Sequence, residues 1–246
     1  MKFRYCITNI IVIQNLTKDY GEGKGIFDVS FNIEKGEVLG FVGANGAGKT
    51  TAIKMLCGLL LPTSGTASIS GFDLKTQAKL IKRNIGYMSQ RFSLYDDLTI
   101  FENMQLFGTI YGIPKKELSQ KIMQSLEELE MKEKANIQVQ SIPLGWKQKL
   151  AFATAILHKP KVVFLDEPTS GVDPIVRREF WNLIYKTAAE GVTIFVTTHY
   201  MDEAEYCEKI SIMSDGELKL IGTPSELKAQ MKVNTIDDVF VKFVKR

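Results

Sequence analysis

The stretch EVLGFVGANGAGKT, residues 37–50, joins an apolar run to a glycine-rich turn and the start of a helical pattern. Its last part, residues 43–50, matches the motif G-x-x-x-x-G-K-[ST] in the expected place between a strand and a helix. Glycines let the backbone turn tightly, so that successive N–H groups point at phosphate oxygens. The stretch therefore predicts a phosphate-binding loop; the alternative is a flexible turn before a helix.

The candidate nucleotide contacts in this loop divide by chemistry. Lys49 would bridge the β- and γ-phosphates, and the Thr50 hydroxyl would bind Mg²⁺. The nucleotide-binding residues predicted from this loop are Gly43, Ala44, Asn45, Gly46, Ala47, Gly48, Lys49, Thr50 and Thr51.

A second apolar strand pattern, KVVFLDEP at residues 161–168, ends in two acids. Ligands of parallel sheets bind at the carboxyl ends of the strands, so Asp166 is expected beside the metal of Thr50. Glu167, one residue further, would point elsewhere and could orient or deprotonate an attacking water. The alternative is a pair of solvated acids at a strand end, which the presence of the glycine loop disfavours.

The composition is that of an ordinary globular protein. The 246 residues are 45% hydrophobic and 24% charged, and the net charge of +3 gives no reason to expect nucleic acid as a partner. Cys6, Cys57 and Cys207 show no metal or disulfide spacing, which favours a reducing compartment. Residues 5–13 fit a strand better than a signal peptide, and no apolar run is long enough to cross a bilayer. A cytoplasmic location is expected.

The order of patterns along the chain indicates an α/β core interrupted by a helical insert. Strand and helix patterns alternate up to residue 90, and helical periodicity dominates residues 91–159. Buried strands return after residue 160, and an Asp-Gly turn near the end predicts a strand pair over residues 208–222. Residues 1–90 and 160–246 would form the core lobe, and residues 91–159 the helical subdomain.

Four motifs in this order give the chain a resemblance to the ATP-binding subunits of ABC transporters. They are GANGAGKT at 43–50, MSQ at 88–90, FLDEPTSGVDP at 164–174 and TTHYMDEAE at 197–205. The resemblance implies a single ABC ATPase domain over residues 1–246. It also implies an α/β fold: a P-loop NTPase (RecA-like) core, an antiparallel β subdomain and an inserted helical subdomain. The implied reaction is ATP hydrolysis with ATP and Mg²⁺ bound.

The resemblance assigns further roles outside the glycine loop. Tyr20 would stack on adenine, although a core or turn tyrosine is the alternative. Gln90 would contact Mg²⁺ or water, and His199 would hydrogen-bond the γ-phosphate or the water. Asp173 would cross a dimer interface. His158, the second of the two histidines, looks merely structural.

The segment SIPLGWKQKL, residues 141–150, departs from the family signature Leu-Ser-Gly-Gly-Gln. Pro143 replaces the serine and cannot donate a hydrogen bond, and Leu144 replaces the first glycine. Ser141 is expected to cap the helix that follows. We expect Gly145 N–H, the helix dipole and Ser141 to keep a weaker contact with the ATP of a partner subunit. The alternative is that this end no longer touches nucleotide.

Partners are implied by the same resemblance. Two ATPase subunits, identical or different, would close around ATP and drive a membrane permease from the cytoplasmic face of the membrane. Residues 91–104 would form the permease docking region, where Phe92, Tyr95 and Phe101 line a groove or belong to the core. The signature and the tail over residues 235–246 resemble the export branch.

Two rival functions stay open at this point. One is a soluble ABC-type ATPase acting in translation or nucleic-acid maintenance, although such proteins usually carry two ATPase halves or a long coiled-coil arm. The other is a nucleotide-sensing subunit with weak hydrolysis, which Pro143 favours and the intact Glu167 and His199 oppose.

Overall fold

A six-stranded sheet carries the glycine loop near its middle, in strand order β10-β9-β3-β8-β7-β6. The computed structural model describes residues 9–90 and 94–244 of the chain. Every neighbouring pair in this sheet is parallel except β9 with β10. The strands are β3 (Val38–Gly43), β6 (Ile85–Met88), β7 (Val162–Asp166), β8 (Thr193–Thr198), β9 (Lys209–Ser214) and β10 (Glu217–Gly222).

The central strands β3, β7 and β8 are buried along their whole length. Strands covered on both faces are continuously apolar, which explains the runs that the sequence shows there. The hairpin predicted over residues 208–222 is confirmed as β9 and β10. Asp215 and Gly216 at its turn both have positive φ, 51° and 77°, as the two central residues of a type I′ turn require.

A second, antiparallel sheet has the strand order β2-β1-β4-β5. Its burial alternates along β2, as the period-two pattern of this strand predicts. Apolar residues of β1, β2 and α1 (Lys49–Leu56) share one core with Leu39 and Phe41 of the larger sheet. The strands are β1 (Asn9–Asp19), β2 (Gly25–Glu34), β4 (Ser64–Ile69) and β5 (Phe72–Asp73).

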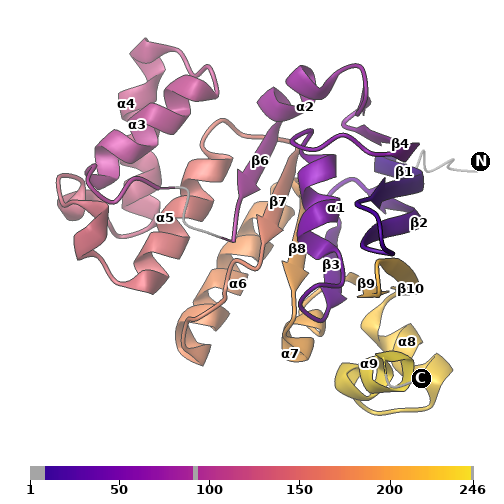
Figure 1. Cartoon of the computed structure of the whole chain (residues 1–246). Helices are drawn as coiled ribbons and strands as arrows, with labels where there is room; N and C mark the ends of the chain where they lie inside the picture. The colour runs from indigo at the N-terminus through magenta and orange to yellow at the C-terminus, as the bar shows by residue number, and fades with distance from the viewer. Residues whose placement is uncertain (1–8, 91–93, 245–246) are drawn as a thin grey trace, which may run out of the picture.

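The helical insert lies beyond the β6 edge of the larger sheet (Figure 1). It contains α3 (Ile100–Ile110), α4 (Lys115–Glu128), α5 (Leu144–Ile156) and the short 3₁₀ turns η1 (Lys132–Lys134) and η2 (Val139–Ser141). Thr99 and Glu102 form a reciprocal capping box at the start of α3, which explains why the helix begins there. In the insert, α4 and α5 instead follow a proline and have no side-chain cap.

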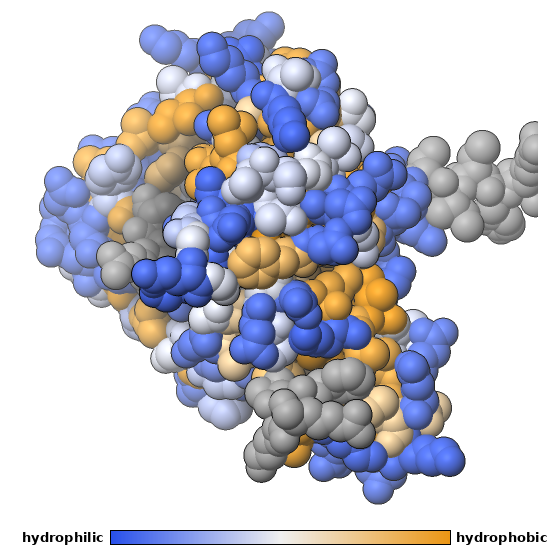
Figure 2. Space-filling view, turned by 45° about the vertical axis from the view of Figure 1, so that its right-hand side comes forward, coloured by the Kyte–Doolittle hydropathy of each residue, from blue (hydrophilic) through white to orange (hydrophobic). Residues whose placement is uncertain are grey.

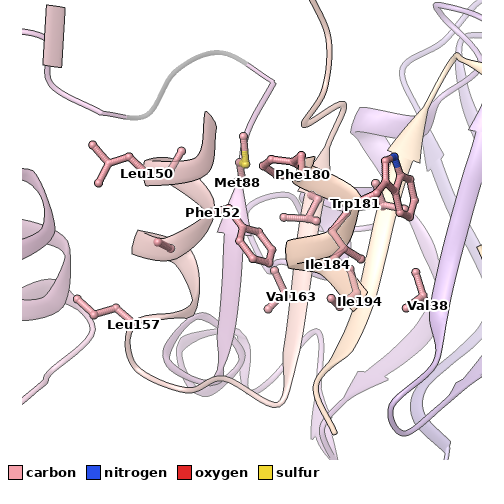
Figure 3. Close-up of a cluster of buried hydrophobic side chains, with 14 of the residues drawn as sticks. Val38, Met88, Leu150, Phe152, Leu157, Val163, Phe180, Trp181, Ile184 and Ile194 are labelled. Atoms are coloured by element: carbon pink, nitrogen blue, oxygen red, sulfur yellow. The ribbon is translucent and has the colours of Figure 1, made fainter. Parts of the chain in front are cut away.

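A shared apolar core joins the insert to the larger sheet. Figure 3 shows Phe152 of α5 beside Phe180 of α6 (Pro174–Ala189), with Val163 and Ile194 of the sheet below them in this view. The Phe152 and Phe180 rings meet edge to face, with centroids 5.4 Å apart. Since α5 packs on both the sheet and α6, it carries contacts between the insert and the core.

The remaining helices are α2 (Ala78–Asn84), α7 (Met201–Ala204), α8 (Pro224–Met231) and α9 (Ile236–Val244). On the face shown in Figure 2, apolar residues occur in separate patches among charged ones, which is usual for a protein surface. Among the described residues, no helix combines the length and apolar character that a bilayer span needs.

Candidate nucleotide-binding site

The glycine loop connects the end of β3 to the start of α1. Gly48, the residue before the helix, has φ of 99°, and a Cβ atom placed on it would lie 2.4 Å from the Ile26 side chain. Only glycine combines this backbone conformation with so close an approach. The first turn of α1 carries no acidic side chain, so the positive end of the helix is available to an anion.

The Lys49 side chain is buried and folds back over the loop. Its ammonium donates to the carbonyl oxygens of Gly43 at 2.8 Å and Ala44 at 3.1 Å. Together with the loop it borders a cavity of about 250 Å³. The cavity is lined by Asn45, Gly46, Gly48, Lys49, Thr50, Thr51, Gln90 and Glu167.

Asp166 and Thr50 meet at one side of this cavity. The Thr50 hydroxyl donates to Asp166 Oδ1 at 3.3 Å, and the Thr197 hydroxyl donates to the same oxygen at 2.7 Å. Burial raises the pKa of Asp166 above its ordinary value, and the two hydroxyl donors oppose that rise. Hydroxyl and carboxylate oxygens are the ligands that Mg²⁺ prefers, so this pair fits the metal of a nucleotide.

Glu167 points away from Asp166 and is contacted by three other candidate residues. Its Oε1 lies 3.3 Å from Lys49 Nζ, and its Oε2 lies 3.0 Å from both Gln90 Nε2 and His199 Nδ1. Its backbone has φ of 49°, and its N–H donates to the Thr197 carbonyl and hydroxyl oxygens. A non-glycine residue in this conformation needs such support, and the support fixes the direction of the carboxylate.

The residues predicted near the base and at the partner face lie outside this cluster. Tyr20 is 57% exposed, and the Lys18 ammonium lies over one face of its ring, 5.5 Å from the ring centre. Asp173 caps α6 by accepting the N–H groups of Ile175 and Val176. These two bonds give Asp173 a structural role within this chain that does not depend on a partner subunit.

The prediction that Ser141 caps the helix is wrong. Ser141 belongs to η2, and the residue before α5 is Pro143, which makes no side-chain capping bond. The Pro143 carbonyl accepts the N–H groups of Trp146 and Lys147 and so begins the helix. Gly145 lies against α6, where an added Cβ atom would be 2.5 Å from Val176 Cγ1. Glycine at this position is therefore required by packing within the chain.

Of the predicted docking aromatics, Phe92 lies outside the described residues. Tyr95 is 53% exposed, whereas Phe101 packs against the apolar core of the insert. Of the two aromatics that the structure describes, Tyr95 has the exposure that a docking residue needs.

The sequence did not indicate a role for two polar residues near the site. Thr197 bonds both acids of the site, and nothing in the sequence distinguishes it from Thr193 and Thr198 of the same strand. Glu203 is fully buried, accepts a bond from the Thr169 hydroxyl and lies 3.4 Å from Arg177 Nε. It lies in the quoted stretch 197–205 but was given no role, because a surface acid and a buried one look alike in sequence.

A strand, glycine loop and helix bearing lysine and threonine, beside a strand-end aspartate, define a P-loop nucleoside triphosphatase. Residues 26–170 match the family model described as "ABC transporter". The chain belongs to the ABC transporter family and is an ABC-type ATPase domain. It is 43% identical over 240 residues to the probable multidrug ABC transporter ATP-binding protein YbhF of Escherichia coli (strain K12), covering 96% of this chain and 42% of that protein. The chain thus spans less than half the length of that relative.

Other relatives agree on the family. The linearmycin resistance ATP-binding protein LnrL of Bacillus subtilis (strain 168) is 34% identical over 91% of this chain and 72% of its own length. Among solved structures, an ATP binding subunit of an ABC transporter matches with a TM-score of 0.84 and 28% identity over 95% of this chain and 98% of the other. A dimeric post-hydrolysis state of the ATP-binding cassette MJ0796 bound to ADP and Pi matches with a TM-score of 0.77 and 27% identity, covering 87% and 98%.

Proposed function

We propose that the chain hydrolyses ATP to power export through a membrane permease, with Glu167 aiming the attacking water. The observation that carries the proposal is the cluster of Lys49, Gln90 and His199 around the Glu167 carboxylate at the edge of the loop cavity. A general base must lie within hydrogen-bond reach of its water and near the phosphate, and the place of Glu167 in the lining of the loop cavity supports this role.

The reaction is ATP + H₂O → ADP + phosphate. The loop N–H groups and the α1 dipole hold the phosphates, and Lys49 turns from Glu167 to the β- and γ-phosphates. The Thr50 hydroxyl, Asp166 and the Gln90 amide would hold Mg²⁺, which neutralises charge on the transferred group when bound. Glu167 then orients water, and His199 hydrogen-bonds the γ-phosphate. Positioning and charge neutralisation supply most of the rate enhancement.

Closure of two ATPase subunits is part of the proposal. The first turn of α5 has no acidic side chain, so its N-terminus favours the negative charge of a partner's ATP. The matched MJ0796 structure is described as a dimer bound to ADP and Pi, which supports this arrangement by analogy. Pro143 offers no hydroxyl to the phosphate, so the contact is weaker than in the signature sequence.

Export is the direction that the relatives favour. Three of them are described as a multidrug transporter protein, a linearmycin resistance protein and a Nod factor export protein. A permease partner would hold the subunit at the cytoplasmic face of the membrane, and exposed Tyr95 lies in the segment proposed to dock it. The two subunits of the closed pair are identical or different.

The proposed function is tested with a Glu167→Gln variant of the full chain. We expect ATP and Mg²⁺ to convert this variant to a dimer in size-exclusion chromatography, because it binds ATP without cleaving it, while wild type returns to monomer as ATP is consumed. The tagged chain should retain an integral membrane protein from detergent-solubilised native membranes. Retention of ribosomal or DNA-binding proteins instead would contradict the transport role.

A further inference from the structure

The terminal strand β6 is held by two stacked side chains from the helical insert. In the described part of the larger sheet, β6 pairs only with β7. His158 Nε2 lies 3.1 Å from the Ile85 carbonyl oxygen, and the Tyr111 ring stacks on the His158 ring. A side chain of the insert therefore bonds the backbone of the terminal strand.

The direction of the His158 bond follows from its chemistry. His158 must donate from Nε2, because a carbonyl oxygen only accepts. Burial raises the pKa of the Tyr111 phenol, so the ring beside His158 stays uncharged.

The two rings are held as one unit. They stack with centroids 3.9 Å apart and planes inclined by only 12°. Tyr111 ends α3, and His158 follows α5, so the rings join the carboxyl ends of two insert helices. Burial lowers the pKa of His158 to about 4, which keeps its ring neutral and able to stack at physiological pH.

The same strand is also in contact with α5 itself. A Cβ atom on Gly86 would lie 2.4 Å from the Ala155 carbonyl oxygen in the last turn of α5. The α5 helix begins at Leu144 and Gly145, where a partner's ATP is proposed to lie. The β6 strand ends at Met88, two residues before Gln90, which donates to Glu167. The contacts therefore run from the α5 N-terminus to the residue beside the proposed base.

We propose that the His158–Tyr111 pair is a positioning device that fixes β6, and through it Gln90, against Glu167 when α5 meets the partner's ATP. The inference rests on the proposed function, since it gives the pair a task only in ATP hydrolysis. Neither residue touches the nucleotide, so both act through Gln90. Loss of the His158 bond or of the stack frees β6 without altering the glycine loop.

Two variants test the bond and the stack separately: His158→Phe removes the hydrogen bond and keeps a ring, and Tyr111→Leu removes the stacked ring. We expect kcat for ATP hydrolysis by the full chain to fall about three- to tenfold in each, as for one lost hydrogen bond, while KM stays within about twofold. His158→Gln, whose amide can donate to Ile85, should recover part of the loss. Amide exchange in β6 should accelerate in His158→Phe, whereas exchange in β7 stays unchanged.

A double-mutant cycle with Gln90→Ala separates positioning from general stability. In the Gln90→Ala background we expect His158→Phe to have no further effect on kcat. The matched control is Thr154→Val, which removes a buried 2.7 Å hydrogen bond to Leu150 inside α5 and should lower the melting temperature without lowering kcat.

Undiminished kcat in both His158→Phe and Tyr111→Leu, or an equal loss with and without Gln90, would overturn the inference. The same series of measurements tests whether Glu167→Gln abolishes the ATP turnover seen in wild type. The proposed function can therefore stand even if the role of the pair fails.

Discussion

Lys49 Nζ lies 3.3 Å from Glu167 Oε1, so the phosphate-binding cation and the proposed base neutralise each other across the loop cavity. Both side chains are largely buried, at 4% and 7% exposure. A buried charge needs a partner, and an incoming triphosphate offers Lys49 a more highly charged one. Nucleotide binding would thus release Glu167 toward the water at the moment when the substrate arrives.

Replacing Lys49 by Gln should weaken ATP binding. We expect an affinity loss of about 10- to 100-fold, because at least one charge-assisted hydrogen bond to phosphate is lost. Titration with a fluorescent ATP analogue measures it. Lys54→Gln is the control, since Lys54 lies on the same helix with an exposed side chain. Equal affinity in both variants would show that the loop does not use this lysine.

Replacing Asp166 by Asn should affect the metal more than the nucleotide. The amide oxygen can still accept from Thr50 and Thr197, so the local fold is retained. We expect the Mg²⁺ concentration for half-maximal ATPase to rise about tenfold or more, while ATP binding without metal is unchanged. An unaltered Mg²⁺ dependence would remove Asp166 from the metal site.

Restoring a hydroxyl at position 143 should strengthen the start of α5. Pro143→Ser is compared with Pro143→Ala, because both lose the proline ring and only one gains a capping group. We expect the free energy of unfolding to be about 1 kcal/mol higher in the serine variant than in the alanine variant. The serine variant should also dimerise at a lower ATP concentration. If the two variants dimerise alike, the α5 N-terminus does not contact the partner's phosphate. Gly145 is a poorer site for this test, because any side chain there meets Val176.

His158 should make stability depend on pH. Its pKa is about 4 in the fold, against 6.5 for an exposed histidine ring, so the unfolded chain binds more protons between these values. Stability from this group is therefore full above pH 6.5 and falls as the pH drops toward 4. We expect the free energy of unfolding, measured by urea denaturation, to fall less between pH 6.5 and 4 in His158→Phe than in wild type. Identical pH slopes would mean that the ring is already protonated in the fold.

The sequence predicted those parts of the structure that local chemistry determines. The glycine loop, the apolar strand before the two acids and the Asp-Gly hairpin turn each carry their own pattern, and each has the expected form. The helical insert was predicted from periodicity alone. Motif order then brought the strand ends into one site, because a parallel sheet gathers them at one edge.

What the sequence could not supply were contacts between distant segments. Gln90 and His199 both reach the same Glu167 oxygen, and no spacing along the chain predicts a shared partner. His158 looked merely structural because its bond to Ile85 spans two parts of the fold. Ser141 was mistaken for a cap because a serine before a helix usually is one, whereas here η2 occupies that residue and Pro143 begins the helix.

The central claim is that the loop holds ATP while Glu167 directs its cleavage. The most direct measurement compares wild type and Glu167→Gln for MgATP affinity by calorimetry and for phosphate release on the same samples. We predict equal or tighter binding in the variant, because Lys49 is freed, together with a loss of turnover of about 10²- to 10⁴-fold. Equal turnover in the two proteins would contradict the claim, as would wild type that binds no MgATP.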